Sequence, residues 1–143
     1  MKKLIRACVS AIVLFSLLLS TACGPSEPLV IKESDTYIII NVVSTQVEIT
    51  ENTTLLDYMN SLKEDGQLEF EIENGMINSI NGIKNPSDWS KCWMLYTSDS
   101  DNSNSAWGEV EYNGKVYGSA IFGAETLKVK DGFTYVWIFK EFD

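Results

Sequence analysis

The chain has 143 residues, of which 45 % are hydrophobic and 22 % are charged, and this size and composition fit one small globular domain. Its 20 acidic and 11 basic residues give a formal net charge of −9, which argues against nucleic acid as a partner because phosphate repels an acidic surface. The sequence contains no histidine, which excludes nucleophiles paired with histidine and histidine metal sites. We therefore expect a protein that is not an enzyme.

The first 22 residues are typical of a secretory signal peptide. Lys2, Lys3 and Arg6 form a basic start, and an apolar run over 7–19 follows it. That run is shorter than the stretch of about 20 apolar residues that a transmembrane helix needs. We therefore expect residues 1–22 to be removed on export.

The residues around Cys23 resemble the lipobox of bacterial lipoproteins, in which the cysteine is lipidated and becomes the first residue. The sequence there is Ser20-Thr21-Ala22-Cys23-Gly24, with a serine where leucine is usual. The resemblance implies an exported protein, anchored to the outer face of the cell membrane by a lipid on Cys23. The alternative is an ordinary secretory peptide with an incidental cysteine. Removing residues 1–22 takes away three of the 11 basic residues and no acidic one, which leaves eight against 20 and a formal charge of −12.

The mature chain is predicted to consist of a tether and one domain. Two prolines, a serine and a glycine within 24–28 indicate a flexible tether, which with the lipidated cysteine covers residues 23–34. Residues 35–143 then form a single ligand-binding domain. Cys92 is the one cysteine left, and its apolar neighbours favour a small core residue.

Two strands and a helix are predicted in the first half of this domain. The β-branched segment 36–43 predicts a strand, and alternation over 47–49 predicts a second one. Thr54 and Asp57 have the spacing of a helix capping box, and Gly66 is placed to end the helix. The apolar side chains of this helix recur on one face: Leu55, Tyr58, Met59 and Leu62.

Strands are predicted for most of the second half. Apolar residues alternate with glutamates over 68–73, which indicates a strand with one solvated face. Residues 76–83 are expected to be extended with a turn at Asn81-Gly82, and 92–97 to form a buried strand.

The C-terminal part is predicted to be a polar loop followed by turns and a last strand. Residues 97–105 are polar, 112–115 are a strong hairpin signal, and Asp131-Gly132 marks a turn before the aromatic strand 133–142. Strands on both sides of one helix favour an α+β fold, and we expect a β-grasp-like mixed sheet packed on one main helix.

Residues 99–104 place oxygen ligands at alternate positions, as the start of a calcium loop does. Asn104 stands where such a loop needs glycine, and Val110 stands where it needs a bidentate glutamate. A solvated loop is therefore the default interpretation and calcium binding is the alternative.

Two aromatic residues are candidates for ligand contact. Trp107 and Phe122 lie among serine, asparagine and glycine, and we expect both in loops. Exposed aromatic side chains on loops tend to mark binding sites, and ordinary loop packing is an equally good alternative.

The order of motifs over residues 36–142 resembles the transcobalamin-like C-terminal domain of intrinsic factor and transcobalamin, the DUF4430 family of bacteria. The resemblance is carried by an opening helix and four later segments, distinctive only in combination. They are Thr54–Met59, Gly75–Ile83, Trp93–Tyr96, Gly118–Ala124 and Leu127–Gly132.

This resemblance implies a β-grasp domain that binds a soluble ligand, which in the vertebrate relatives is cobalamin. Two loops lie against the corrin there, and we add Trp107 to the matching positions as an exposed aromatic with no counterpart in the family. The expected ligand-binding residues are Trp93, Leu95, Tyr96, Ser98, Trp107, Gly118, Ser119, Ala120, Ile121 and Phe122. Residues 99–116 look like an insertion between the two loops, and the sequence leaves open whether this insertion acts as a lid or binds calcium.

The vertebrate proteins hold cobalamin between this domain and a large helical domain, which this chain lacks. A one-sided site buries less of its ligand, so we expect weak binding or a ligand shared with a partner protein, either a membrane transporter or another surface protein. The leading hypothesis is a membrane-anchored module that captures a corrinoid for uptake, with no resident cofactor. The alternative is a surface protein-protein interaction or adhesion module without a small-molecule ligand.

Overall fold

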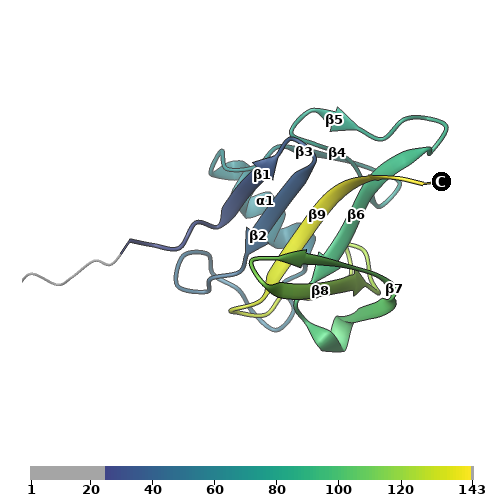
Figure 1. Ribbon diagram of the computed structural model, residues 1–143. Coiled ribbons are helices and arrows are strands. Elements are labelled where there is room, and N and C mark those ends of the chain that lie inside the picture. Colours follow the sequence, from purple (N-terminus) through teal and green to yellow (C-terminus); the bar gives the residue numbers. More distant parts are fainter. Residues whose placement is uncertain (1–24, 143) are drawn as a thin grey trace, which may run out of the picture.

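The computed structural model describes residues 25–142, which form nine strands, one α-helix and one 3₁₀ turn (Figure 1). Six strands make a large sheet in the order β1-β2-β9-β6-β8-β7, and three make a small sheet in the order β3-β4-β5. The bounds are β1 Val30–Ser34, β2 Tyr37–Asn41, α1 Leu55–Glu64, β3 Phe70–Glu73, β4 Met76–Ile80, β5 Ile83–Lys84, β6 Lys91–Thr97, η1 Ser100–Asn102, β7 Ser103–Tyr112, β8 Lys115–Ala120 and β9 Thr134–Glu141.

The α+β class is confirmed, but the expectation of a mixed sheet is wrong. Each pair of neighbouring strands within residues 25–142 is antiparallel. The reason lies in the central strand, because β9 runs between β2 and β6 and opposite to both. The two strands that point the same way are therefore separated rather than paired.

The helix α1 forms as its terminal residues predict. Thr54 accepts a hydrogen bond from the backbone N–H of Asp57 at 3.1 Å, and the Asp57 carboxylate accepts one from the backbone N–H of Thr54 at 2.9 Å. At the other end Gly66 has φ +72°, and the N–H of Gln67 donates to the carbonyl of Leu62 at 2.9 Å. These contacts satisfy backbone groups that a helix end otherwise leaves unpaired.

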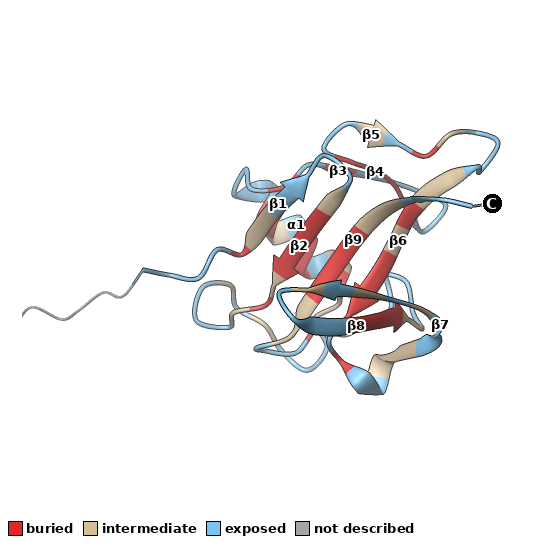
Figure 2. Cartoon of the chain, viewed as in Figure 1, coloured by how far each residue is buried: buried red, intermediate tan, exposed pale blue. Residues whose placement is uncertain are grey.

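The main core lies between the large sheet and the layer formed by α1 and the small sheet (Figure 2). The helix contributes the four side chains that its spacing predicts, and all four are fully buried. From β9 the aromatic face contributes Tyr135 and Trp137, with Phe133 and Phe139 partly buried beside them. Within residues 25–142 the members of this core lie between residues 29 and 139.

A second, smaller cluster covers the opposite face of the large sheet. The hairpin of β7 and β8 folds back over β2 and β9, which Figure 1 shows in green in front of these strands. Ile39, Tyr96 and Val136 of the sheet are buried beneath it, in one cluster with Tyr117 of β8. The segment 99–116 is therefore mostly a hairpin of the sheet rather than a loose insertion, because Tyr117 and the half-buried Val110 give it apolar surface to bury.

Three expectations about local structure are wrong. Residues 30–34, assigned to the tether, form β1 because Val30 and Ile31 pair with Ile40 and Ile39. Residues 47–49 form no strand. The backbone N–H groups of Gln46 and Val47 donate to the carbonyl of Val43 and form a turn, and Val47 and Ile49 pack against the core from this loop. Ile72 is 41 % exposed because a bulge after Glu71 breaks the alternation of β3.

The predicted signal peptide, Cys23 and the first residues of the tether lie outside residues 25–142. Within that range the chain has no helix of the length and apolarity that crossing a membrane requires. Hydrogen bonds attach the segment before β1 to the rest of the domain from Glu27 onward. The carbonyl of Glu27 accepts from the Gln46 side chain at 2.9 Å, and that of Pro28 accepts from the Asn41 side chain at 3.0 Å.

Candidate functional site

An open hollow of about 270 Å³, which we name the aromatic groove, lies beside β6. Its walls come from four parts of the chain: the turn between β3 and β4, the loop between β5 and β6, the strand β6 and the segment after β8. Trp137 of β9 forms part of its floor. The lining residues are mostly aromatic or apolar, and Met76, Trp89 and Phe122 are exposed at its rim.

The aromatic groove brings together six of the ten residues predicted to bind a ligand. These six come from two segments that are more than twenty residues apart in the sequence. The segments meet because β8 pairs with β6 at Tyr96 and Ser119, which places the end of β8 against the side of β6. The six residues are Trp93, Leu95, Ser119, Ala120, Ile121 and Phe122.

Three of the other predicted residues have structural roles away from the groove. Tyr96 points to the opposite face of the sheet, because side chains alternate along β6, and lies in the second cluster. The Ser98 hydroxyl accepts from the backbone N–H of Thr134 at 3.0 Å. Gly118 permits close packing, since a Cβ atom there would lie 3.0 Å from the Ser103 side chain.

Trp107 is also outside the groove, and its placement in a loop is wrong. It lies within β7, where the register with β8 shifts between Asn104 and Glu109, and it is 66 % exposed. The bulge turns the segment out of the regular ladder, so the indole ring is left on the surface of the hairpin.

The sequence reasoning missed the residues that the loop between β5 and β6 brings to the groove. Asn85 is buried and holds this loop: its Nδ2 donates to the carbonyl of Ile77 at 3.0 Å and its Oδ1 accepts from the N–H of Trp93 at 3.1 Å. Trp89, four residues later, is 51 % exposed and has φ +58°. The local signal for it is the Asn-Pro pair, which favours a turn.

Fixed contacts hold the aromatic floor of the groove. The indole Nε1 of Trp93 donates to the carbonyl of Ile83 at 2.8 Å, and the ring lies 5.4 Å from that of Phe139. Trp137 is buried beside them, and its Nε1 has no hydrogen-bond partner among residues 25–142. An unpaired buried N–H is costly to the fold, and this nitrogen has almost no surface open to a ligand.

Cys92 lies at the edge of the aromatic groove and is only half-buried, so the expectation of a core residue is wrong. Its thiol donates to the Met94 Sδ atom, with 3.6 Å between the sulfurs. Burial raises the pKa of the Cys92 thiol above its ordinary value. The thiol is therefore protonated at neutral pH and is a weak nucleophile.

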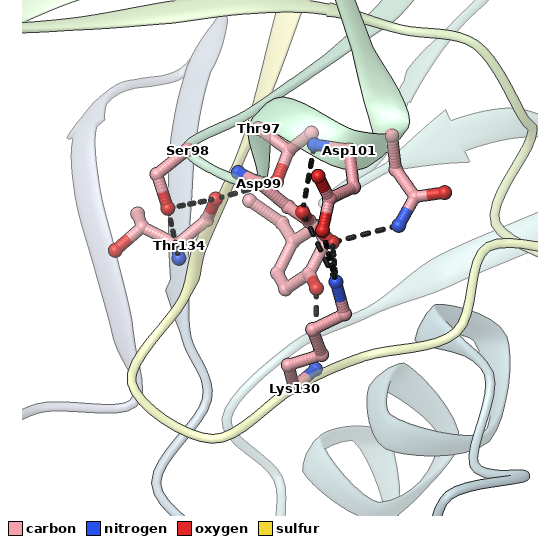
Figure 3. Close-up of polar contacts among 8 residues, drawn as sticks. Thr97, Ser98, Asp99, Asp101, Lys130 and Thr134 are labelled. Atoms are coloured by element: carbon pink, nitrogen blue, oxygen red, sulfur yellow. Dashed lines mark hydrogen bonds and ion pairs between the residues drawn. The ribbon is translucent and has the colours of Figure 1, made fainter.

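The residues that resemble the start of a calcium loop, 99–104, instead contribute to an ion pair with Lys130. Asp99 is 1 % exposed, and its carboxylate pairs with the Lys130 ammonium group at 3.0 Å (Figure 3). Asp101 also contacts this lysine, at 3.4 Å, and the side chain of Asn102 donates to Asp99 at 2.7 Å. Within residues 25–142 no group of three or more acidic or cysteine side chains is arranged to hold a metal ion.

Together the fold and the groove define a small antiparallel α+β domain with an open aromatic surface at one side. No family model, curated protein or solved structure matches this chain. The groove therefore has to be interpreted from its own chemistry. Flat apolar walls with a few backbone and amide groups suit a ligand that presents a flat apolar face and hydrogen-bonding edges.

Proposed function

We propose that this protein is a membrane-anchored extracytoplasmic binding lipoprotein, attached by a lipid on Cys23, whose aromatic groove captures a corrinoid for uptake. It carries out no chemistry of its own. The observation that carries the proposal is the convergence of two segments, 93–95 and 119–122, on one groove. These are the segments that the resemblance to transcobalamin-like domains assigns to the ligand.

The chemistry of the groove supports a corrinoid. A corrin ring is flat and apolar at its centre and carries amides at its edge, which match an aromatic floor and exposed polar groups. Asn85 and Ser119 place polar side chains within mostly apolar walls. The resemblance also supports a β-grasp-like fold, in which a sheet covers a single helix. This chain departs from the mixed sheet expected for that fold, because β2 and β9 are antiparallel.

The size of the groove sets how the ligand is held. Its volume of about 270 Å³ is small beside the roughly 300–1,000 Å³ of pockets that enclose a drug-sized ligand. A corrinoid is larger still, so the groove covers one edge of it and leaves the rest exposed. Weak binding and transfer to a membrane transporter follow from such a one-sided site.

The test is equilibrium dialysis of cobinamide and cobalamin against the full chain in lipid nanodiscs, measured by visible absorbance. We expect saturable binding that Phe122→Ala weakens about tenfold, because this side chain forms the rim of the groove. The matched control is Val116→Ala, an exposed apolar residue on β8 outside the groove, which should leave binding unchanged. If neither corrinoid binds, or if both variants weaken binding equally, the proposal fails.

A protein partner is the second candidate, and one observation favours it. Trp107 and Val116 are 66 % and 55 % exposed on the hairpin of β7 and β8, away from the aromatic groove. Exposed tryptophan is enriched at the centres of protein interfaces. A photoreactive amino acid at position 107 should then crosslink one protein in intact cells. Absence of a specific adduct would exclude this surface as a contact.

A further inference from the structure

A second hollow adjoins the aromatic groove and has a different chemistry. It encloses about 500 Å³ between the β3–β4 turn, the strands β4 and β5 and the loop between β5 and β6, and we name it the polar hollow. It shares Met76, Ile77, Asn85 and Trp89 with the groove. The side chains found only in the polar hollow are nearly all polar: Glu73, Asn74, Asn78, Lys84, Ser87 and the ring of Pro86.

Trp89 forms an aromatic platform at the edge of this hollow. The loop that carries it is held at both sides: the backbone N–H of Trp89 donates to the carbonyl of Pro86 at 3.1 Å, and the Asp88 carboxylate accepts from the Ser90 hydroxyl at 2.8 Å. The residue keeps a left-handed backbone, at φ +58°, that side chains other than glycine and asparagine rarely adopt. A half-exposed tryptophan is thus fixed in position at a conformational cost.

The polar wall is fixed as well. Asn78 is 8 % exposed, and its Nδ2 donates to the Glu73 carboxylate at 2.9 Å, while no hydrogen bond within residues 25–142 uses its Oδ1 atom. The backbone N–H of Asn85 donates to the carbonyl of Asn78 at 2.8 Å, which ties the wall to the loop of Trp89. The hollow therefore presents amide and carboxylate groups, from Asn78, Asn85 and Glu73, that are held in place before a ligand arrives.

We infer that the polar hollow binds a glycan segment, with one sugar ring lying on Trp89. A sugar offers an apolar C–H face and closely spaced hydroxyl groups, and the hollow offers an aromatic ring beside amides and a carboxylate. Glu73 and Lys84 carry opposite charges, so the hollow as a whole favours a neutral ligand. An extended apolar ligand fits poorly, because it would bury these polar groups without partners. The inference does not rest on corrinoid binding, since Glu73, Asn78 and Lys84 lie outside the aromatic groove.

The test is calorimetric titration of the full chain in lipid nanodiscs with chitotriose and with maltotriose, using empty nanodiscs as the blank. Saturable heat with either trisaccharide is the expected result. Trp89→Ala should weaken binding about tenfold or more, whereas Trp107→Ala, at the other highly exposed tryptophan, should leave it unchanged.

A second variant keeps the result independent of any damage to the Trp89 loop. Asn74 has φ +53°, so Asn74→Gly removes an amide from the hollow and still suits the turn. We expect it to weaken binding several-fold with an unchanged thermal midpoint. No saturable heat with either sugar, or equal losses in the Trp89 and Trp107 variants, would overturn the inference.

Discussion

The side chain of Asp99 is almost inaccessible to solvent and still favours its charged form. Burial alone would raise the pKa of this carboxyl group, but hydrogen bonds from Asn102, Lys130 and the N–H of Asp101 together lower it below its ordinary value of 3.8. The same contact raises the pKa of Lys130. Figure 3 shows that these groups come from two separate loops, so the pair fastens the turn after β6 to the segment before β9.

We predict that Asp99→Asn lowers the free energy of unfolding by about 1–3 kcal/mol at pH 7, because it weakens several hydrogen bonds to a charged acceptor. A carboxyl group with a lowered pKa stabilises the fold above its unfolded pKa, and this contribution is lost as pH falls through the folded pKa. In urea titrations the difference between the two proteins should therefore shrink below about pH 4.

Asp101→Asn is the matched control for this prediction. Asp101 contacts the same lysine but its side chain is 83 % exposed, so its loss should matter little. An equal effect of the two substitutions, or a difference that stays constant as the pH falls below about 4, would show that the buried charge is not the stabilising feature.

Among the elements, two-residue turns of one kind join three pairs of strands. Asn74-Gly75, Asn81-Gly82 and Asn113-Gly114 all have positive φ at both residues. Such turns match the twist of antiparallel strands, which explains why asparagine followed by glycine recurs at them. Gly66 also has a positive φ, and it ends α1 because glycine adopts this left-handed conformation without steric cost.

We predict that Gly66→Ala destabilises the protein by about 1 kcal/mol, since a side chain disfavours φ +72° although nothing lies within 4 Å of the added Cβ atom. Gly123→Ala is the control, because that position also has open space but does not have positive φ. Thermal unfolding of both variants measures the difference. Equal midpoints would mean that the helix end tolerates the strain.

Across the whole molecule, the hairpin of β7 and β8 is fastened at both ends. One end pairs with β6, and at the other the Tyr112 hydroxyl donates to the Glu33 carboxylate of β1 at 2.7 Å. The Tyr112 ring also lies 6.1 Å from that of Tyr37. The hydrogen bond to Glu33 raises the pKa of Tyr112. The hairpin thus crosses one face of the large sheet and covers the second cluster.

We predict that Tyr112→Phe loosens this hairpin without unfolding the domain, because the ring contact is kept and only the link to Glu33 is lost. Amide hydrogen exchange should become faster in residues 104–119 and stay unchanged in α1. Uniformly faster exchange would instead indicate that the hairpin and the main core open together.

Features set by neighbouring residues could be predicted from the sequence. The capping box of Thr54 and Asp57, the end of the helix at Gly66 and the turn at Asn81-Gly82 each depend on local chemistry alone. The pattern of the helix also identified its four buried residues.

Features set by distant pairing could not be predicted. Whether 30–34 forms a strand depends on β2, and the direction of β9 between β2 and β6 decides that the sheet is antiparallel. The bulge that exposes Ile72 has no signal in an otherwise regular alternation. At the site, the two segments named by family resemblance meet in the groove, whereas Tyr96 was misplaced because strand alternation turns it away.

If the proposed lipid is attached to Cys23, the hydrogen bonds of Glu27 and Pro28 to the domain limit how far the domain reaches from the bilayer. With a lipid on Cys23, only four peptide units separate the anchor from Glu27, a span of at most about 14 Å. The chain joins the domain beside Asn41, at the end of the sheet where β9 begins, whereas Trp89 precedes Lys91 at the opposite end. If the proposed lipid is attached to Cys23, the Asn41 end of the domain faces the lipid headgroups and Trp89 lies at the end away from them.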